Sequence, residues 1–426
     1  MDADLARVAR QFHREPGQAT PADEALVHAL LVDPQGDPRM VERAGWALLR
    51  AAGRIPETAP EAAGWIETDS FARDLLTETQ LTVLPVERLL TAMRRWLLLE
   101  GRHSAYPLTR AALIAQTAHN GGVWLFDEAE RAAIAAAPDF APAYRPPLAD
   151  PAPIPDHASP VTRAVATQFT EWPFPVWQRV LALPGATLDP DGDILVAGCG
   201  TGREALRLAR HAPAAKVLAI DLSAASIAYA RARCGDAVNL EFRQHDLHHA
   251  DALGRGFDHI SCCGVLHHLP DPEAGWAALA GVLRPGGTMR VMLYSRIARL
   301  QVDSARRPIA DLIGQPATPD LMRAARARLM DSPIAASPGF YTMGGVRDLL
   351  LYAHEDRFDI PRIGRAQQTL GLELTEFALP GRAVRERYLA QNPHDPGLCD
   401  LVALAAFERA HPRLFGGMYD IRCRKP

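Results

Sequence analysis

The chain has 426 residues, of which 48% are hydrophobic, and its 46 basic and 50 acidic residues leave a formal net charge of −4. This size suggests two to three domains with a sizeable core, and the mixed charge argues against a dedicated nucleic-acid binder. The mean hydropathy is −0.09, and no apolar run approaches the ~20 residues of a membrane helix. The first residues carry acids where a signal peptide is positive, and the six cysteines form no C-x-x-C pair. We therefore expect a cytoplasmic protein with free thiols and no membrane partner.

Residues 1–145 have the pattern of an all-helical N-terminal domain. Apolar side chains recur at helical spacing in 86–99, and the same theme continues in 108–116 and 127–137. No repeat of about 34 residues is evident, so the sequence does not establish a tetratricopeptide array. We expect this domain to serve either substrate recognition or dimerisation, which makes a homodimer a candidate assembly.

Residues 146–157 are a proline-rich linker, and a second domain is expected over 158–426. Gln168, Trp172 and Phe174 lie near its start, and prolines follow both aromatic residues. A rigid aromatic lid of this kind could exclude water and hold a cationic ligand by cation–π attraction. The alternative is ordinary packing of a first helix on a sheet.

The most informative stretch is a glycine-rich loop at 198–202. An apolar strand-like run, 194–197, enters this loop, and a helix-like segment, 204–211, leaves it. Bare backbone at such a turn can approach a polar ligand closely. A dinucleotide loop would need a further glycine where Arg203 stands. The G-x-G-x-G spacing therefore suits a ligand without a pyrophosphate, although a tight turn with no ligand is the alternative.

Four further strand-like runs follow, at 216–220, 240–245, 257–263 and 288–294. Asp221 ends the first of them, where a carboxylate can accept both ribose hydroxyls of a nucleoside. The alternative for Asp221 is a helix N-cap.

These runs, with "GVLHHLPDP" from Gly264 and "LRPGG" from Leu283, resemble the class I S-adenosylmethionine (SAM) methyltransferases. The resemblance implies a Rossmann-like α/β core of seven strands, mostly parallel, with an antiparallel seventh strand. It implies SAM as cofactor and S-adenosylhomocysteine (SAH) as product. It also implies that Asp246 receives the adenine amino group, although a surface turn is the alternative for this acid. The expected cofactor-binding residues are Gln168, Phe174, Gly198, Cys199, Gly200, Gly202, Glu204, Asp221, Leu222, Asp246, Leu247, Cys263, Gly264 and His268.

The stretch 168–177 is also similar to a "Q-Y-E-x-x-P-Y-P-x-W" signature of a bacterial methyltransferase group whose members often carry N-terminal helical or tetratricopeptide-like regions. Segment 347–358 resembles the same group. Phe169 replaces the usual tyrosine, and 119–122 is glycine-rich where an acidic-aromatic pair is expected. Faintly similar relatives include protein-lysine methyltransferases of bacterial outer-membrane proteins, which is too loose a relation to transfer a substrate.

Two side chains near the strand ends are candidates for catalysis. His267 could take a proton from the acceptor, and Tyr294 could contact the substrate. The alternatives are a structural histidine and a core tyrosine. His245, His248 and His249 have mixed spacing and no clear fourth ligand, so no metal site is expected.

Helical insertions are expected at about 296–365 and 380–413, on either side of a sixth strand at 372–377; a seventh strand follows at 417–422. Such insertions usually shape a substrate pocket or an interface. Tyr341, Arg347 and His354 are further candidates for contact with the substrate.

Methyl transfer from SAM needs alignment and desolvation more than a catalytic triad. We therefore expect an enzyme that methylates an N or O nucleophile. We prefer a peptide or protein side chain as the acceptor, because the helical domain is larger than a small metabolite would require. A small-molecule methyltransferase is the alternative within the same class. A catalytically silent SAM/SAH-binding scaffold and a nucleotide-dependent oxidoreductase are alternatives of other classes.

Overall fold

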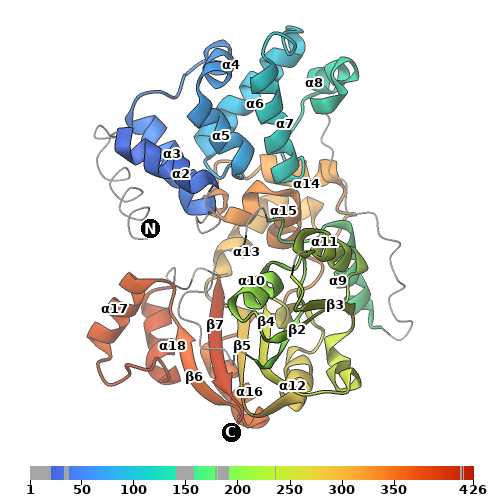
Figure 1. Ribbon diagram of the computed structural model, residues 1–426, viewed down its shortest axis with the longest axis vertical. Helices are drawn as coiled ribbons and strands as arrows, with labels where there is room; N and C mark the ends of the chain where they lie inside the picture. Colours follow the sequence, from blue (N-terminus) through green and yellow to red (C-terminus); the bar gives the residue numbers. More distant parts are fainter. Residues whose placement is uncertain are drawn as a thin grey trace. The chain divides into compact units, whose positions relative to one another are not determined.

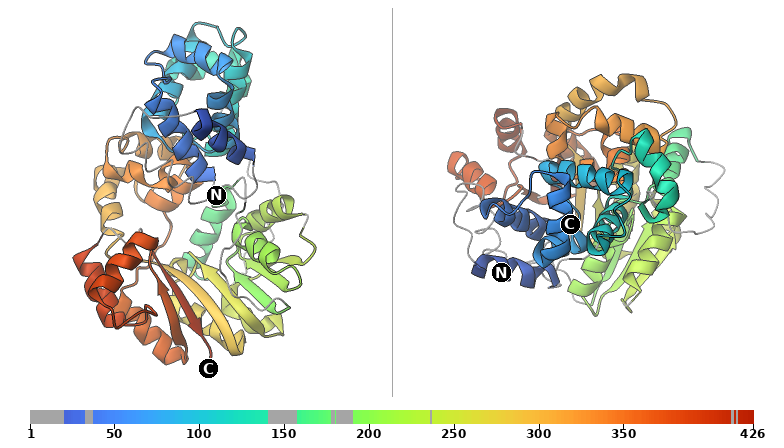
Figure 2. Two further views of the ribbon diagram at one scale, coloured as in Figure 1. Left: turned by 60° about the vertical axis from the view of Figure 1, so that its left-hand side comes forward. Right: turned by 90° about the horizontal axis from the view of Figure 1, so that it is seen from above.

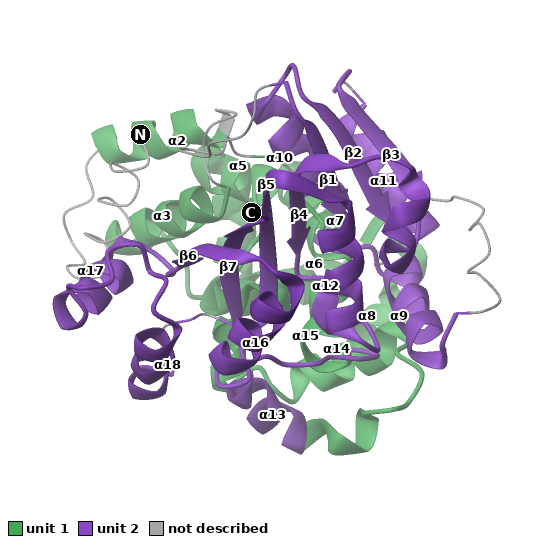
Figure 3. Cartoon of the chain, turned by 90° about the horizontal axis from the view of Figure 1, so that it is seen from below, with its two compact units in different colours: residues 1–145, 176–181, 308–351 green, residues 146–175, 182–307, 352–426 purple. Residues whose placement is uncertain are grey.

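The computed structural model describes residues 21–32, 38–140, 158–177, 180, 191–235, 237–412, 415 and 417–426. The chain divides into two compact units (Figure 3). Unit 1 comprises residues 1–145, 176–181 and 308–351, and unit 2 comprises 146–175, 182–307 and 352–426. Residues 308–351, which the sequence placed in an insertion of the second domain, are thus grouped with the N-terminal helices. The proline-rich linker at 146–157 lies outside the described residues.

Unit 1 is helical throughout its described part (Figure 1). The three segments expected from helical spacing are α6, α7, and α8 with the short 3₁₀ turn after it, and prolines occupy the first turns of α6 and α7. Buried ion pairs join its elements: Arg326 binds both carboxylate oxygens of Glu87 at 2.6 and 2.7 Å. The helices are α2 Pro21–Val32, α3 Pro38–Ala51, α4 Ala59–Thr68, α5 Ser70–Glu78, α6 Leu84–Leu99, α7 Pro107–Asn120, α8 Glu128–Ala133, α14 Pro319–Ala327 and α15 Met343–Leu350.

Unit 2 contains one seven-stranded sheet of order β3-β2-β1-β4-β5-β7-β6. Strands β1 to β5 pair in parallel, and β7 lies antiparallel between β5 and β6. This topology confirms the expected Rossmann-like core and its antiparallel seventh strand. The strands are β1 Asp193–Ala197, β2 Lys216–Asp221, β3 Leu240–Gln244, β4 Phe257–Cys263, β5 Leu283–Tyr294, β6 Glu373–Ala378 and β7 Met418–Arg424.

Helices cover the sheet on both faces (Figure 2). Helix α9 packs beside α11, whereas α12 packs beside α16, which in turn contacts α18. The helices are α9 Pro160–Glu171, α10 Arg203–His211, α11 Ala224–Cys234, α12 Pro272–Val282, α13 Leu300–Arg306, α16 Ile360–Leu370, α17 Arg382–Gln391 and α18 Leu401–Ala410; two 3₁₀ turns, η3 Leu247–Leu253 and η4 Leu266–His268, complete the connections.

Three element boundaries differ from those expected. The turn at 284–287 is part of β5, because Leu283 already pairs with Phe257 before the register shifts at His259. The helical insertion expected at about 380–413 contains two helices, since Pro393 and Pro396 lie in the connection between α17 and α18 and cannot continue a helix. The seventh strand, expected at 417–422, extends from Met418 to Arg424.

The core of unit 2 lies between the sheet and the helices on its faces. Fully buried side chains from β4, β5 and α12 meet there, among them Phe257, Leu293 and Trp276. Within the described part of the chain, every helix is too short or too polar to cross a membrane.

Candidate functional site

The carboxyl ends of the parallel strands gather the residues that the sequence analysis singled out. The glycine loop follows β1, Asp221 ends β2, and Asp246 comes two residues after β3. Gly264 follows β4, and Tyr294 ends β5. In open α/β sheets ligands bind at this edge. The sheet therefore brings the expected cofactor loop, the two acids and the candidate acceptor residues to one side.

The three glycines of the loop all have left-handed backbone conformations, with φ of +69° at Gly198, +51° at Gly200 and +84° at Gly202. A Cβ atom added at Gly198 would lie 2.4 Å from a methyl group of Val265, and one at Gly200 would lie 2.7 Å from the carbonyl oxygen of Phe174. A side chain at either position is therefore excluded by both conformation and space. The turn therefore needs glycine for its own packing.

Asp221 is tied to the glycine loop. Its carboxylate accepts the Gly200 amide at 2.7 Å and the Ser223 amide at 2.8 Å. Burial raises the pKa of this carboxyl group, while these backbone hydrogen bonds oppose the rise. The N-cap of α11 is Ser223, whose hydroxyl accepts the Ser226 amide, so Asp221 is not the cap of that helix. The carboxylate has about four acceptor sites, more than these backbone bonds use, so Asp221 can accept a further hydroxyl donor.

Asp246 lies at the tip of β3 and caps η3. One of its oxygens accepts the backbone amide of His248 at 2.9 Å, and the same oxygen lies 3.0 Å from the His248 ring. Burial acts to raise the pKa of Asp246, but the bonds from His248 outweigh it and hold that pKa below its ordinary value. The acid is thus anionic near neutral pH. Beside it Leu247 is buried, and the carbonyl of Leu222 accepts the Gln244 side chain at 3.0 Å.

The segment before β1 lies against the glycine loop. The Thr201 hydroxyl donates to the Pro175 carbonyl at 2.5 Å, and the Phe174 carbonyl lies next to Gly200. The carbonyl of Phe169 accepts the Ser223 hydroxyl at 3.1 Å. Residues 169–175 are therefore held close to both the loop and the tip of β2.

Two residues expected at the cofactor have other partners in the structure. The buried Gln168 side chain accepts the Ala353 amide at 2.7 Å. Glu204 accepts Arg290 at 2.9 Å, and Arg290 also binds Asp420 of β7. These contacts tie Gln168 and Glu204 to other parts of unit 2. Their roles in binding SAM stay predictions.

The remaining expected cofactor residues line the end of β1 and β4. Cys199 is buried, and its amide donates to the Ile220 carbonyl at 2.9 Å. Burial raises the pKa of the Cys263 thiol to about 12, which keeps it protonated near neutral pH. Gly264 has a φ of +77°, and its amide donates to Met292 of β5 at 3.1 Å. These positions offer backbone and a neutral thiol to a ligand.

His267 is fully buried at the end of β4. Its Nδ1 accepts the Tyr294 amide at 3.2 Å, so the neutral ring carries its proton on Nε2. Burial lowers the pKa of His267 well below its ordinary value, and neighbouring His268 and Arg299 act in the same direction. These contacts favour the structural alternative for His267 over the role of a base.

His268 is also buried, and its ring joins three segments of unit 2. Its Nδ1 lies 2.9 Å from the His354 carbonyl, and its ring meets Phe169 edge-on at 5.4 Å between centroids. His354 in turn places its Nε2 3.1 Å from the Leu269 carbonyl. Tyr341 and Arg347, the other candidates from the insertion, belong to unit 1.

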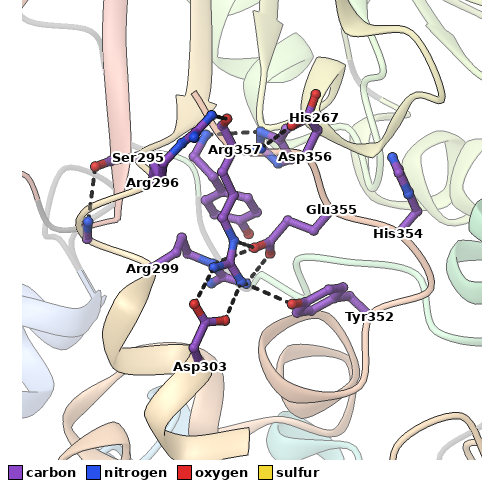
Figure 4. A network of polar contacts seen from close by, with 12 residues as sticks. His267, Ser295, Arg296, Arg299, Asp303, Tyr352, His354, Glu355, Asp356 and Arg357 are labelled. Carbon is purple, nitrogen blue, oxygen red and sulfur yellow. Dashed lines mark hydrogen bonds and ion pairs between the residues drawn. The ribbon is translucent and has the colours of Figure 1, made fainter. Parts of the chain in front are cut away.

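A network of charged residues that the sequence did not reveal includes Arg299, Glu355 and Arg357 (Figure 4), and it reaches Tyr294 through Arg299. The Tyr294 ring stacks on His267 at 3.9 Å between centroids, and the Arg299 guanidinium lies 4.2 Å from the same ring. Arg299 pairs with Glu355, which also binds Arg357 at 2.8 Å. The only sequence signal was a run of charges at 355–357 inside an insertion.

Among the described residues, no group of three or more histidine, cysteine, aspartate or glutamate side chains is arranged to hold a metal ion. The three histidines near β3 are used otherwise: His248 contacts Asp246, and His245 Nε2 lies 2.8 Å from the His249 carbonyl.

Comparison with known proteins identifies the domain. Residues 194–287 match the family model described as "Methyltransferase domain". The chain thus contains a methyltransferase domain, and the match supports SAM as its cofactor. An uncharacterized protein of Synechococcus sp. is 44% identical over 125 residues, which are 29% of this chain and 30% of that protein. The trans-aconitate 2-methyltransferase of Deinococcus radiodurans is 38% identical over 104 residues, which are 24% of this chain and 38% of that enzyme.

Among solved structures, PKMT2 from Rickettsia typhi in complex with AdoHcy is similar over 63% of this chain and 52% of that one, with 16% identity and a TM-score of 0.42. A likeness at this level does not bear on activity. The chain spans less than half the length of the two curated relatives named above. The bacterial-group signature at 168–177 lies outside the matched family model.

Proposed function

We propose that this protein transfers a methyl group from SAM to a nitrogen or oxygen nucleophile. The observation that carries the proposal is the bond between Asp221 and the Gly200 amide, which joins the acid at the tip of β2 to the glycine loop of the methyltransferase domain. An acid so placed can receive ribose hydroxyls where the loop offers bare backbone.

The residues present fit SAM. The glycine loop would pass under its methionine portion, Asp221 would hold the ribose, and Asp246 would receive the adenine amino group. The lowered pKa of Asp246 suits that role, because an anionic carboxylate accepts such a donor. Trp172 and Phe174 would exclude water from the reacting atoms. When bound, SAM supplies a methyl group already activated by its sulfonium centre.

The acceptor side asks for little acid–base chemistry. His267 is neutral, and its Nδ1 is engaged by the Tyr294 amide. We therefore infer that the acceptor enters unprotonated, or loses its proton to water, and that Tyr294 helps to align it. Alignment of this kind accounts for most of the acceleration that methyl transfer requires.

Our preferred acceptor is a peptide or protein side chain, because unit 1 adds a large helical body to the domain that binds SAM. The same body could instead form a homodimer, which light scattering would test. A small-molecule acceptor is the second candidate, since one relative is named for trans-aconitate. That similarity covers 24% of this chain and 38% of that enzyme, which is too little to carry its substrate over to this chain.

The deciding experiment incubates the pure protein with methyl-labelled SAM and cell extract from its own source, followed by a size cut-off filter. Label retained above the cut-off and released by protease supports a polypeptide acceptor. Label that passes the filter supports a small molecule and turns unit 1 into a candidate oligomerisation module. SAM binding without transfer to any fraction would support a silent scaffold instead. Preferential binding of NAD over SAM would support an oxidoreductase, which the absence of a glycine at Arg203 argues against.

A further inference from the structure

Segment 352–358 lies at the ends of β4 and β5, on the side of unit 2 where we place the acceptor. The Phe358 amide donates to the Tyr294 carbonyl at 2.9 Å, and the Arg296 amide donates to the Phe358 carbonyl at 2.8 Å. The Asp356 amide donates to the His267 carbonyl at 2.7 Å. Backbone hydrogen bonds thus fix this segment against the ends of both β4 and β5.

The segment delivers a buried carboxylate to a buried guanidinium. The side chain of Glu355 is 0% exposed and that of Arg299 is 5% exposed. Arg299 binds Glu355 through two nitrogens: Nε donates to Oε1 at 3.0 Å, and Nη2 donates to Oε2. Two-point pairing fixes the plane of the guanidinium as well as its position. Burying such a pair costs desolvation, which stability alone rarely repays.

A second arginine, Arg357, also binds the Glu355 carboxylate. Arg357 donates to Glu355 at 2.8 Å and binds both oxygens of Asp303 at 2.6 and 2.8 Å. Asp303 lies on α13, the helix that begins directly after Arg299. Two arginines therefore fix Glu355, which in turn orients the Arg299 guanidinium (Figure 4).

The oriented guanidinium meets the residue that we place at the acceptor. The Arg299 Cζ atom lies 4.2 Å from the centroid of the Tyr294 ring, and the His267 ring stacks on Tyr294 at 3.9 Å with 29° between planes. The Tyr294 backbone is held as well, because its amide donates to His267. The position of the tyrosine ring thus depends on Arg299, whose own orientation depends on Glu355.

We propose that Arg299 and Glu355 are positioning residues for methyl transfer: their buried pair holds the Tyr294 ring in the place where it aligns the acceptor. The inference rests on the proposed function. Neither residue needs to touch SAM, since both act through Tyr294. A ring displaced by about 1 Å lowers the rate on the order of 10- to 100-fold while leaving the cofactor bound.

The test compares three variants. Glu355→Gln breaks the pair and leaves Arg299 without its counter-charge. The double variant Arg299→Met with Glu355→Leu replaces the pair by apolar side chains, a change that often preserves stability. The control is Glu273→Gln: Glu273 forms a two-point pair with Arg362, at 2.6 and 2.8 Å, that is more exposed than the pair of Arg299 and Glu355 and involves neither Tyr294 nor His267.

Four quantities are measured for each variant: the thermal midpoint, SAM affinity by calorimetry, the ¹⁹F resonance of 3-fluorotyrosine at position 294, and transfer from labelled SAM in the extract fraction that serves the wild type. The resonance is assigned with Tyr294→Phe. We expect Glu355→Gln and the double variant to shift it, to keep SAM affinity within about twofold and to lose transfer on the order of 10- to 100-fold. Glu273→Gln should match the wild type.

The double variant decides between positioning and mere stabilisation. Recovery of the thermal midpoint without recovery of transfer supports the positioning role. Recovery of both would overturn it, as would an unshifted tyrosine resonance. A wild-type protein that binds SAM but labels no fraction would overturn the proposed function itself, and the positioning role with it.

Discussion

At the scale of single residues, the glycine loop imposes the sharpest steric demand. Gly200 combines a φ of +51° with a Cβ position 2.7 Å from a carbonyl oxygen. Backbone oxygen cannot rotate away as a flexible side chain does, so relief requires a shift of the segment before β1. That segment carries the aromatic residues that we place over SAM. Crowding at one Cβ atom is thus transmitted to the cofactor site.

We therefore expect Gly200→Ala to weaken SAM binding by more than about tenfold, because the left-handed conformation alone costs ~1–2 kcal/mol and the carbonyl contact adds to it. Calorimetric titration with SAM measures the effect. Gly254→Ala is the matched control: its φ is +68°, but a Cβ there would meet nothing within 4 Å. If Gly200→Ala bound SAM as tightly as Gly254→Ala does, the proposed site would not lie at this loop.

At the scale of elements, the role of the segment before β1 can be tested directly. Thr201 is fully buried, and its hydroxyl donates to the Pro175 carbonyl. Thr201→Val keeps the shape but removes the donor, which leaves a carbonyl without this partner at a cost of about 1 kcal/mol. We expect SAM affinity to fall about fivefold, together with a loss of stability of that same order.

The control for this element is Thr91→Val in α6, where the hydroxyl likewise donates to a carbonyl, that of Glu87, at 3.0 Å. This variant should lose no SAM affinity. If Thr201→Val bound SAM as the wild type does, residues 169–175 would be packing on the sheet and not forming a lid.

The helices and strands also show how much of the fold could be predicted from the sequence. Strands β1 to β4 were predictable because each apolar run ends in a glycine or an acid, and α6 was predictable from its helical spacing. The start of β5 was not, since Leu283 joins the sheet by pairing with Phe257, a contact made across the chain. The pair of Arg299 and Glu355 spans 56 residues, and neither member has a motif of its own. Periodicity reports local structure, whereas such pairs exist only once the sheet has formed.

At the scale of the whole molecule, the division into two compact units predicts two unfolding transitions with separate pH dependence. Unit 1 contains a fully buried acid, Glu42 on α3, which accepts the Thr82 amide and hydroxyl, both at 2.8 Å. Burial raises the pKa of Glu42 to about 7, although the bonds from Thr82 oppose the rise. The unfolding transition of unit 1 should therefore shift with pH whether or not the stability of unit 2 changes.

The sign of the effect follows from proton binding. Between the ordinary pKa of 4.5 and about 7, the folded unit holds a proton that the unfolded chain has lost. The unfolding free energy of unit 1 should therefore be highest below this window and fall by about 3 kcal/mol as the pH rises through it. Urea unfolding at several pH values from 4 to 8 measures the slope. Glu42→Gln should flatten it, and Glu57→Gln, at an exposed position, should not. A slope that survives Glu42→Gln would place the titrating group elsewhere and leave Glu42 ionised within its pocket of α3.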